Sequence, residues 1–185
     1  MHQPTPPSFE SWLGAILGQD QHQVRRLIKD ATGLHFLIAW SLFESKCCGG
    51  DFKAARHCSA AALPDMSAEE KSVLRASAGV LHTRYQSKSN LNRLAPPDVT
   101  PYKALEAFTL NLQKPFNELT AADITSLCVF VASRVRNNMF HGQKGIDDWL
   151  HDKALISTCT TILQMLVSAS ERAAPTLSVD VKSAA

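Results

Sequence analysis

Apolar residues recur at helical spacing along the first third of the chain. From about Asp20 to Cys47 they fall three or four positions apart, and this spacing predicts one long helix. Between Leu34 and Phe43 almost every face of that helix is apolar, and Glu44 ends the run. A helix that is apolar on all sides is usually buried. We therefore expect the segment to be a central helix of the fold.

Start and stop signals elsewhere predict further helices joined by short loops. Ser67 and Glu70 form a capping-box pattern, Thr120 and Asp123 cap a later helix, and Gly142 follows that helix in the position favoured for a terminating glycine. Besides the first long helix, helices are expected at about 11–17, 51–62, 67–87, 102–113, 120–141 and 147–170, with a loop over 90–101. No stretch alternates apolar and polar residues for long enough to predict a strand. The fold class expected is therefore all-α, an antiparallel bundle of five to six helices.

The chain of 185 residues fits one compact domain. Three prolines, Pro4, Pro6 and Pro7, predict an N-terminal arm with a short helix over 1–19. The bundle is expected over 20–172 and a loose tail over 173–185. The longest dense apolar run, 34–43, is about half as long as a membrane-spanning helix, and the N-terminal residues lack the pattern of a signal peptide. We expect a soluble, cytoplasmic protein with no membrane contact.

Charge and cysteine content limit the kinds of site that the protein can be expected to have. The net charge of +2 is too small to indicate a broad cationic surface for a nucleic-acid backbone, so any contact with RNA has to be local. The odd number of cysteines, five, does not indicate a disulfide framework. Cys128 and Cys159 lie in apolar helical patterns and are expected to be buried. Cys47, Cys48, His57 and Cys58 lack the spacing of known zinc modules, so no metal or other cofactor is expected.

The segment from Ser133 to Gly142 carries the most informative polar residues. On a helix, Ile124, Cys128, Val131, Val135 and Met139 form one core stripe. Asn138 lies about 60° from that stripe, Arg134 about 100° and His141 about 120° on the same side, whereas Arg136 lies about 100° away on the opposite side. These groups sit at the margin of a buried face, where a polar group needs a partner.

Arg136 and His141 are about 140° apart around an ideal helix, so their side chains do not converge within one regular helix. Two arrangements would bring them together. The helix can end at His141, with Gly142 letting the chain turn, or two copies of the helix can face each other across a two-fold axis and share one site.

The stretch from Arg136 to His141 matches the R-x4-H signature of the HEPN superfamily, the higher eukaryote and prokaryote nucleotide-binding domains. The sequence RVRNNMFHG, 134–142, resembles the form found in one bacterial HEPN group, and LIAWSLFES, 37–45, is similar to that group's first core helix. The resemblance covers roughly residues 20–170. It implies a bundle of four or five helices that dimerises with both motifs at the interface. Many members are ribonucleases that need no metal, and several are toxins or defence effectors.

By this resemblance, Arg136 and His141 are the catalytic pair and Asn137 is the polar residue of the motif. RNA supplies its own nucleophile, the 2′-OH, so such a site needs only a proton carrier such as His141 and a cation such as Arg136. Gln143 stands where some members have a tyrosine that a partner nucleotidyltransferase modifies, which argues against a partnership of that kind. The predicted function is a metal-independent endoribonuclease that acts as a toxin or antiviral effector, with RNA as substrate and an antitoxin or regulatory protein as a further partner.

Supporting roles are predicted for Asn138, Arg134 and Glu44. One hypothesis is that Glu44 pairs with Arg134 or Arg136 and holds the guanidinium in place. The simpler interpretation is that the basic residues and asparagines belong to an ordinary helix end, where they bond the last carbonyls. The alternative function is a non-catalytic helical dimer that binds RNA, a nucleotide or a protein partner through the same cleft.

Overall fold

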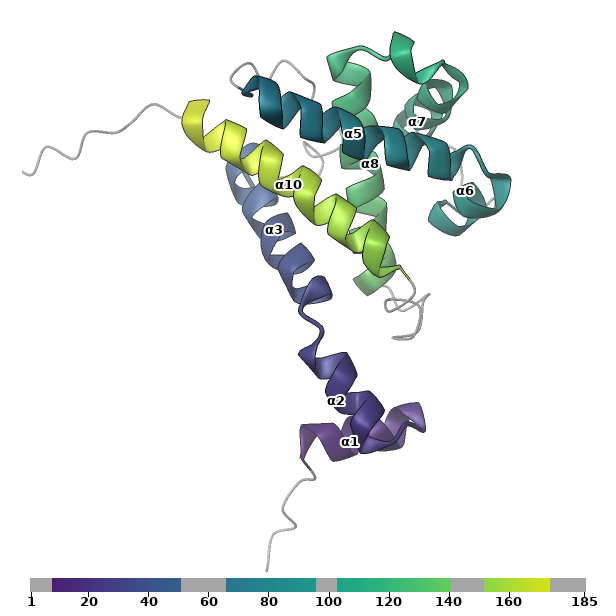
Figure 1. Ribbon diagram of the computed structural model, residues 1–185, viewed down its shortest axis with the longest axis vertical. Coiled ribbons are helices and arrows are strands. Elements are labelled where there is room, and N and C mark those ends of the chain that lie inside the picture. The colour runs from purple at the N-terminus through teal and green to yellow at the C-terminus, as the bar shows by residue number, and fades with distance from the viewer. Residues whose placement is uncertain (1–7, 51–65, 96–102, 141–151, 174–185) are drawn as a thin grey trace, which may run out of the picture.

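The computed structural model describes residues 8–50, 66–95, 103–140 and 152–173. These residues form helices and no strand, which confirms the all-α fold class (Figure 1). The helices are α1 (Phe9–Leu17), α2 (Gln21–Lys29), α3 (Thr32–Cys47), α5 (Ala68–Tyr85), α6 (Lys88–Leu94), α7 (Lys103–Gln113), α8 (Ala121–Phe140) and α10 (Lys153–Ala173), and Phe116–Glu118 forms a short 3-10 turn. The predicted helix at 51–62, the cap at Gly142, the helix start at Asp147 and the C-terminal tail lie outside the described residues.

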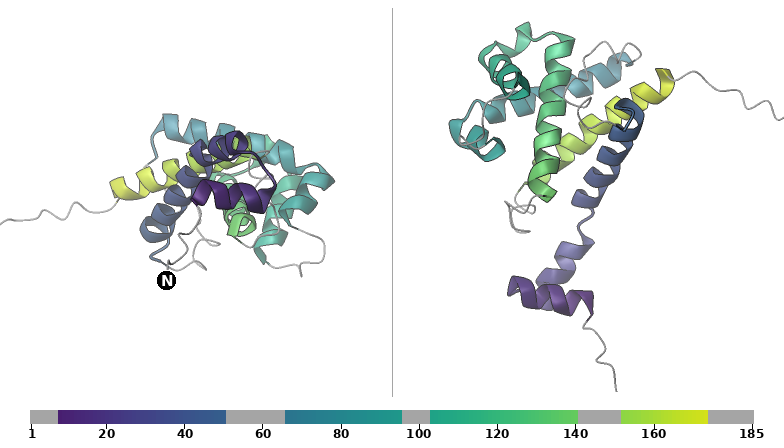
Figure 2. Two further views of the ribbon diagram at one scale, coloured as in Figure 1. Left: turned by 90° about the horizontal axis from the view of Figure 1, so that it is seen from below. Right: turned by 180° about the vertical axis from the view of Figure 1, so that it is seen from behind.

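Helix α10 lies between α3 and α5 and packs against both (Figures 1 and 2). Two ion pairs link opposite ends of α5 and α10, Arg172 with Glu70 and Arg84 with Asp152. These two helices are therefore antiparallel, as expected.

Helices α3 and α10 run in the same direction. At the start of α10, Lys153 pairs with Asp30, which lies two residues before α3. At the other end of the two helices, Ser170 Oγ donates to Lys46 O over 3.0 Å. The expectation of antiparallel neighbours was therefore wrong for this pair. A parallel pair is possible because the intervening chain, more than a hundred residues long, is free to return to the same end of the bundle.

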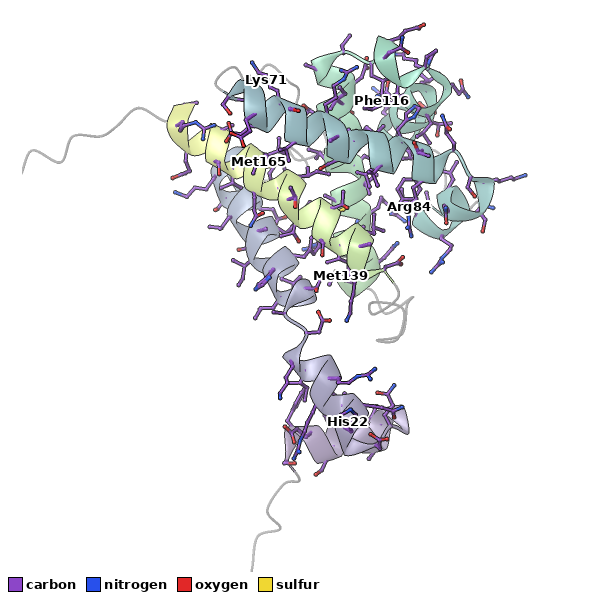
Figure 3. The ribbon with its side chains drawn as sticks, viewed as in Figure 1. His22, Lys71, Arg84, Phe116, Met139 and Met165 are labelled. Carbon is purple, nitrogen blue, oxygen red and sulfur yellow. The ribbon has the colours of Figure 1, made fainter. Side chains whose placement is uncertain are left out.

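The helix that is buried on all sides is α8. Its residues 127–133 are all buried, and α8 packs against α5, α7 and α10. The prediction that the segment Leu34–Phe43 is buried on all sides was wrong, because α3 buries Phe36, Trp40 and Phe43 but leaves Leu34, Ile38 and Leu42 about half exposed. Figure 3 shows the side chains that fill the space among α5, α8 and α10, with Met139 near the end of α8.

Two predicted element boundaries were wrong. The single helix expected over 20–47 is broken into α2 and α3 at Asp30, whose carboxylate accepts a hydrogen bond from Thr32 N at 2.9 Å and pairs with Lys153. The loop expected over 90–101 begins with α6, whose residues Asn90 and Leu94 are fixed by contacts to Arg84 and Arg134. Each departure combines a local contact with a partner that is distant in the sequence, Lys153 for Asp30 and Arg134 for Leu94.

Helices α1 and α2 form a hairpin that projects from the end of the bundle (Figures 1 and 2). We call α1 and α2 together the arm. Leu13 of α1 and Val24 of α2 are buried, and the two helices pack mainly on each other. No helix in the described ranges is both long enough and apolar enough to cross a membrane.

Candidate functional site

The last turns of α8 carry a strip of polar residues beside the core. We call Arg134, Arg136, Asn137 and Asn138 the polar strip. All four are half-buried, whereas Val135 and Met139, which alternate with them, are buried in the core. The core stripe predicted from the sequence, Ile124, Cys128, Val131, Val135 and Met139, is buried along its whole length.

One side of the polar strip faces α6. Arg134 Nε donates to Leu94 O over 3.0 Å, and Asn138 lies one turn further along the same face of α8. Asn138 borders a hollow that α6 also lines with Asn90 and Arg93. Arg134 therefore serves as a link between helices, and Asn138 contributes its amide to the rim of the hollow.

Arg136 lies on the other side of α8. Its Nη1 donates to Asn137 Oδ1 over 3.3 Å. Because the two residues are adjacent in the chain, this contact fixes the direction of the guanidinium relative to the helix end. The guanidinium has five N–H donors in a planar fork, so a cation held in this way matches the geometry of a phosphate.

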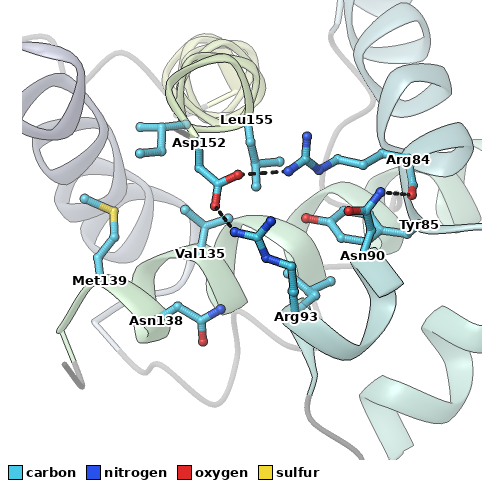
Figure 4. Close-up of a pocket in the computed structure, with 11 residues that line it drawn as sticks. Arg84, Tyr85, Asn90, Arg93, Val135, Asn138, Met139, Asp152 and Leu155 are labelled. Carbon is cyan, nitrogen blue, oxygen red and sulfur yellow. Dashed lines mark hydrogen bonds and ion pairs between the residues drawn. The ribbon is translucent and has the colours of Figure 1, made fainter. Parts of the chain in front are cut away.

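The hollow beside the polar strip has an ion-paired wall (Figure 4). The space in it that the centre of a water-sized sphere can reach is about 30 Å³. Asp152 accepts a hydrogen bond from Arg84 at 2.9 Å and lies 3.8 Å from the guanidinium of Arg93. Asn90 Nδ2 donates to Arg84 O over 3.0 Å. With two arginines and one carboxylate, the wall carries a net positive charge.

The deeper part of the hollow is apolar and holds a tyrosine. Tyr85 is 2% exposed, and burial raises the pKa of its hydroxyl above the ordinary value, so the hydroxyl stays protonated at neutral pH. Leu94, Val135, Met139, Leu155 and Ile156 complete the lining. The hollow is therefore a small, mainly apolar depression with a few polar groups at its rim.

The residues predicted for catalysis are only partly placed. Arg136 and Asn137 are together at the end of α8, whereas His141 lies outside the described residues. Glu44 is half-buried near the end of α3. In the portion of the chain with described coordinates, no ion pair joins it to Arg134 or Arg136. The bracing role of Glu44 stays a prediction, and Glu44→Ala with unchanged fold and activity would contradict it.

The wall of the hollow was not predicted from the sequence. Three separate segments supply its residues, Arg84, Asn90, Arg93 and Asp152. The sequence around them shows only a basic residue near a helix end and an acidic residue before an apolar run, and neither pattern indicates a shared site. A loop was predicted over 90–101, where the structure has most of α6. The last helix was predicted to start at Asp147, which placed Asp152 inside it, whereas Asp152 lies just before α10. Their convergence is a property of the tertiary fold.

Two of the cysteines lie in the core. Cys128 and Cys159 are fully buried, as predicted, and form no disulfide with each other. Burial raises the pKa of Cys159 to about 12. Among the described side chains, no three or more His, Cys, Asp or Glu residues are gathered closely enough to hold a metal ion.

No protein-family model matches the chain, and comparisons with curated proteins and with solved structures find no significant match.

Proposed function

We propose that the protein is a metal-independent endoribonuclease of the HEPN type that acts as a toxin or an antiviral defence effector. The observation that carries this proposal is the position of Arg136. It lies half-buried at the margin of the core near the end of α8, hydrogen-bonded to Asn137, five residues before His141 in an R-x4-H pattern.

These residues suit the cleavage of RNA by its own 2′-OH. Histidine is the side chain that gains and loses a proton most readily near neutral pH, so we assign to His141 the step that accepts the 2′-OH proton or donates a proton to the departing 5′ oxygen. The 2′ oxygen bonds to phosphorus as the bond to the 5′ oxygen breaks, which leaves a 2′,3′-cyclic phosphate. Arg136 stabilises the extra negative charge on the phosphate oxygens in the transition state, and Asn137 keeps its guanidinium in position.

A second copy of the chain is part of this proposal. On an ideal helix Arg136 and His141 point about 140° apart, so one regular helix does not aim both at one phosphate. Two α8 ends related by a two-fold axis would bring Arg136 of one chain near His141 of the other.

The deciding experiment incubates the purified protein with RNA in excess chelator. We expect cleavage that persists in the chelator and falls at least about a hundredfold in both Arg136→Ala and His141→Ala. Arg26→Ala and His22→Ala are matched controls, because both residues are exposed on α2, and they should cut like the wild type. Circular dichroism establishes that each variant is folded. Cleavage that needs added metal, or that survives both motif substitutions, would contradict the proposal.

The hollow favours a second candidate, a non-catalytic dimer that binds RNA or a nucleotide. Its rim presents Asn90, Arg93 and Asn138, and the Nε of Arg84 is buried without a hydrogen-bond partner in the described part of the chain. Amide groups suit the edges of bases, and an arginine suits phosphate. Saturable RNA binding that is lost in Asn138→Ala, with no cleavage of any RNA, would establish this function instead of the first.

A further inference from the structure

The outer face of α3 is apolar and exposed. Leu34, Ile38 and Leu42 are 58%, 51% and 45% exposed, and their spacing of four residues places them in one stripe along the helix. The opposite face, with Phe36, Trp40 and Phe43, is buried. Helix α3 therefore has the all-round apolar composition of a buried helix, but a single chain covers only one of its faces.

The arm carries a second exposed apolar stripe. On α1, Phe9, Trp12 and Ile16 are 63%, 48% and 66% exposed, and they share one face of the helix because they lie three and four residues apart. The rings of Phe9 and Trp12 are in contact, with centroids 5.5 Å apart. Leu13, at the edge of the same stripe, is covered, whereas most of the stripe faces solvent.

The link between α2 and α3 holds the arm away from the bundle. Asp30 accepts a hydrogen bond from Thr32 N at 2.9 Å and pairs with Lys153 at the start of α10. These contacts fix the chain between the two helices, and the arm projects beyond the end of α3 (Figure 1). The stripe on α1 is therefore poorly placed to fold back over α3 of its own chain.

We propose that the arm of one chain docks onto a second copy, so that the α1 stripe of each chain covers the outer face of α3 in the other. Because each chain gives its arm to the other, a two-fold axis relates the two contacts. The assembly is therefore complete as a dimer, and neither stripe remains exposed. It uses no residue of the polar strip, so Ile38→Glu and Trp12→Glu test it separately from the motif substitutions Arg136→Ala and His141→Ala.

The exposed area agrees with what a stable dimer needs. The six side chains are each about half exposed, and a large apolar side chain of this kind has roughly 200 Å² to bury. Together they would remove roughly 600 Å² of apolar surface per chain, and neighbouring polar atoms add to this. A standard interface buries about 800 Å² per partner, so the two stripes together supply most of the area that such an interface needs.

The first test measures molar mass in solution by light scattering after size exclusion. We expect the wild type to be a dimer at micromolar concentration. Ile38→Glu and Trp12→Glu should each raise the dissociation constant at least about tenfold, since each places a charge in the apolar contact. Val80→Glu is the matched control, because Val80 is 60% exposed on α5, away from both stripes, and the variant should dimerise like the wild type. Helical circular dichroism unchanged from the wild type establishes that the variants are folded.

A mixing experiment tests the exchange itself. A pair formed from Ile38→Glu and Trp12→Glu retains one intact contact, in which the normal arm of the first chain meets the normal α3 of the second. The mixture should therefore form more dimer than either variant alone. If each stripe instead paired with its own copy, mixing would restore nothing, and that result would overturn the proposal. A monomeric wild type, including one that sediments with vesicles of anionic phospholipid, would overturn it as well.

Discussion

Asp152 is the residue on which the wall of the hollow depends. It is 8% exposed and lies between Arg84 of α5 and Arg93 of α6, immediately before α10. If a largely buried carboxylate loses its charge, its arginine partners no longer have a negative charge beside them. The resulting loss of folding free energy is larger than the net stabilisation from the intact ion pair. The position of three helices around the hollow therefore depends on one side chain.

We expect Asp152→Asn to lower the free energy of unfolding by about 1–3 kcal/mol, a range that allows for screening of the partly exposed arginines. Urea denaturation measures the change. Glu106→Gln removes an exposed carboxylate from α7 and should change stability by less than about 0.5 kcal/mol. Equal effects of the two substitutions would show that Asp152 is not a structural centre.

Thiol reactivity reports the burial of the core cysteines. Cys128 and Cys159 are fully buried, and burial raises the pKa of both thiols, that of Cys159 to about 12. Since the thiolate is the reactive form, neither should be alkylated in the folded protein at pH 8. Cys47 is only half-buried and should react before either of these two. Peptide mapping by mass spectrometry measures the order, and rapid alkylation of Cys128 without denaturant would contradict the packing of α8.

At the scale of single elements, the capping box of α5 should make a measurable contribution to the stability of the protein. Ser67 Oγ accepts from Glu70 N at 3.1 Å, and Glu70 Oε2 accepts from Ser67 N at 2.9 Å. We expect Ser67→Ala to destabilise the protein by about 1 kcal/mol. Ser72→Ala, on the exposed surface of the same helix, should be neutral or slightly stabilising because alanine favours helix. The thermal unfolding midpoints of the two variants measure the difference, and equal midpoints would refute the role of the cap.

The break between α2 and α3 predicts a pH dependence. Hydrogen bonding from Lys153 and then Thr32 lowers the pKa of Asp30 to about 2. A carboxyl group with a lowered pKa stabilises the folded state above its unfolded pKa, about 3.9, and this contribution disappears as the pH falls through the folded value. Asp30→Asn keeps an acceptor for Thr32 but removes the charge, and it should cost about 1 kcal/mol or less at pH 7.

The difference in stability between wild type and Asp30→Asn should be constant above about pH 5 and shrink between roughly pH 4 and pH 2. Urea denaturation at a series of pH values measures it. A difference that does not change over this range would show that the pair with Lys153 does not stabilise the fold.

These elements also show what the sequence can predict. The helices α1, α5, α7 and α8 follow from apolar spacing and caps, because both signals are local. The same local signals do not show which of the apolar helices is buried on all sides. Helices α3 and α8 are both rich in apolar residues, but only α8 is surrounded by other helices. Likewise, Asp30 breaks the first predicted helix through a partner, Lys153, that no local pattern indicates.

At the scale of the whole molecule, one part of the candidate site could be predicted from the sequence and another part could not. The buried stripe of α8 and the half-buried polar strip beside it are confirmed, since both follow from helical periodicity. The hollow could not be predicted, because it combines α5, α6, α8 and the start of α10. Asn138 borders the hollow, whereas Arg136 lies on the other side of α8, so the hollow and the motif arginine face different sides of that helix.

A composite active site makes a prediction that no single-chain site shares. If Arg136 of one chain acts with His141 of the other, a dimer of Arg136→Ala with His141→Ala contains one intact site and one doubly defective site. Equal mixing makes half of the dimers mixed, so activity should return to roughly a quarter of the wild-type value, although each variant alone is inactive. If each chain used its own pair, both sites of the mixed dimer would be defective, and mixing would restore nothing. Cleavage of RNA measured after subunit exchange therefore separates the two arrangements, and dilution below the dimer dissociation constant should abolish the recovered activity.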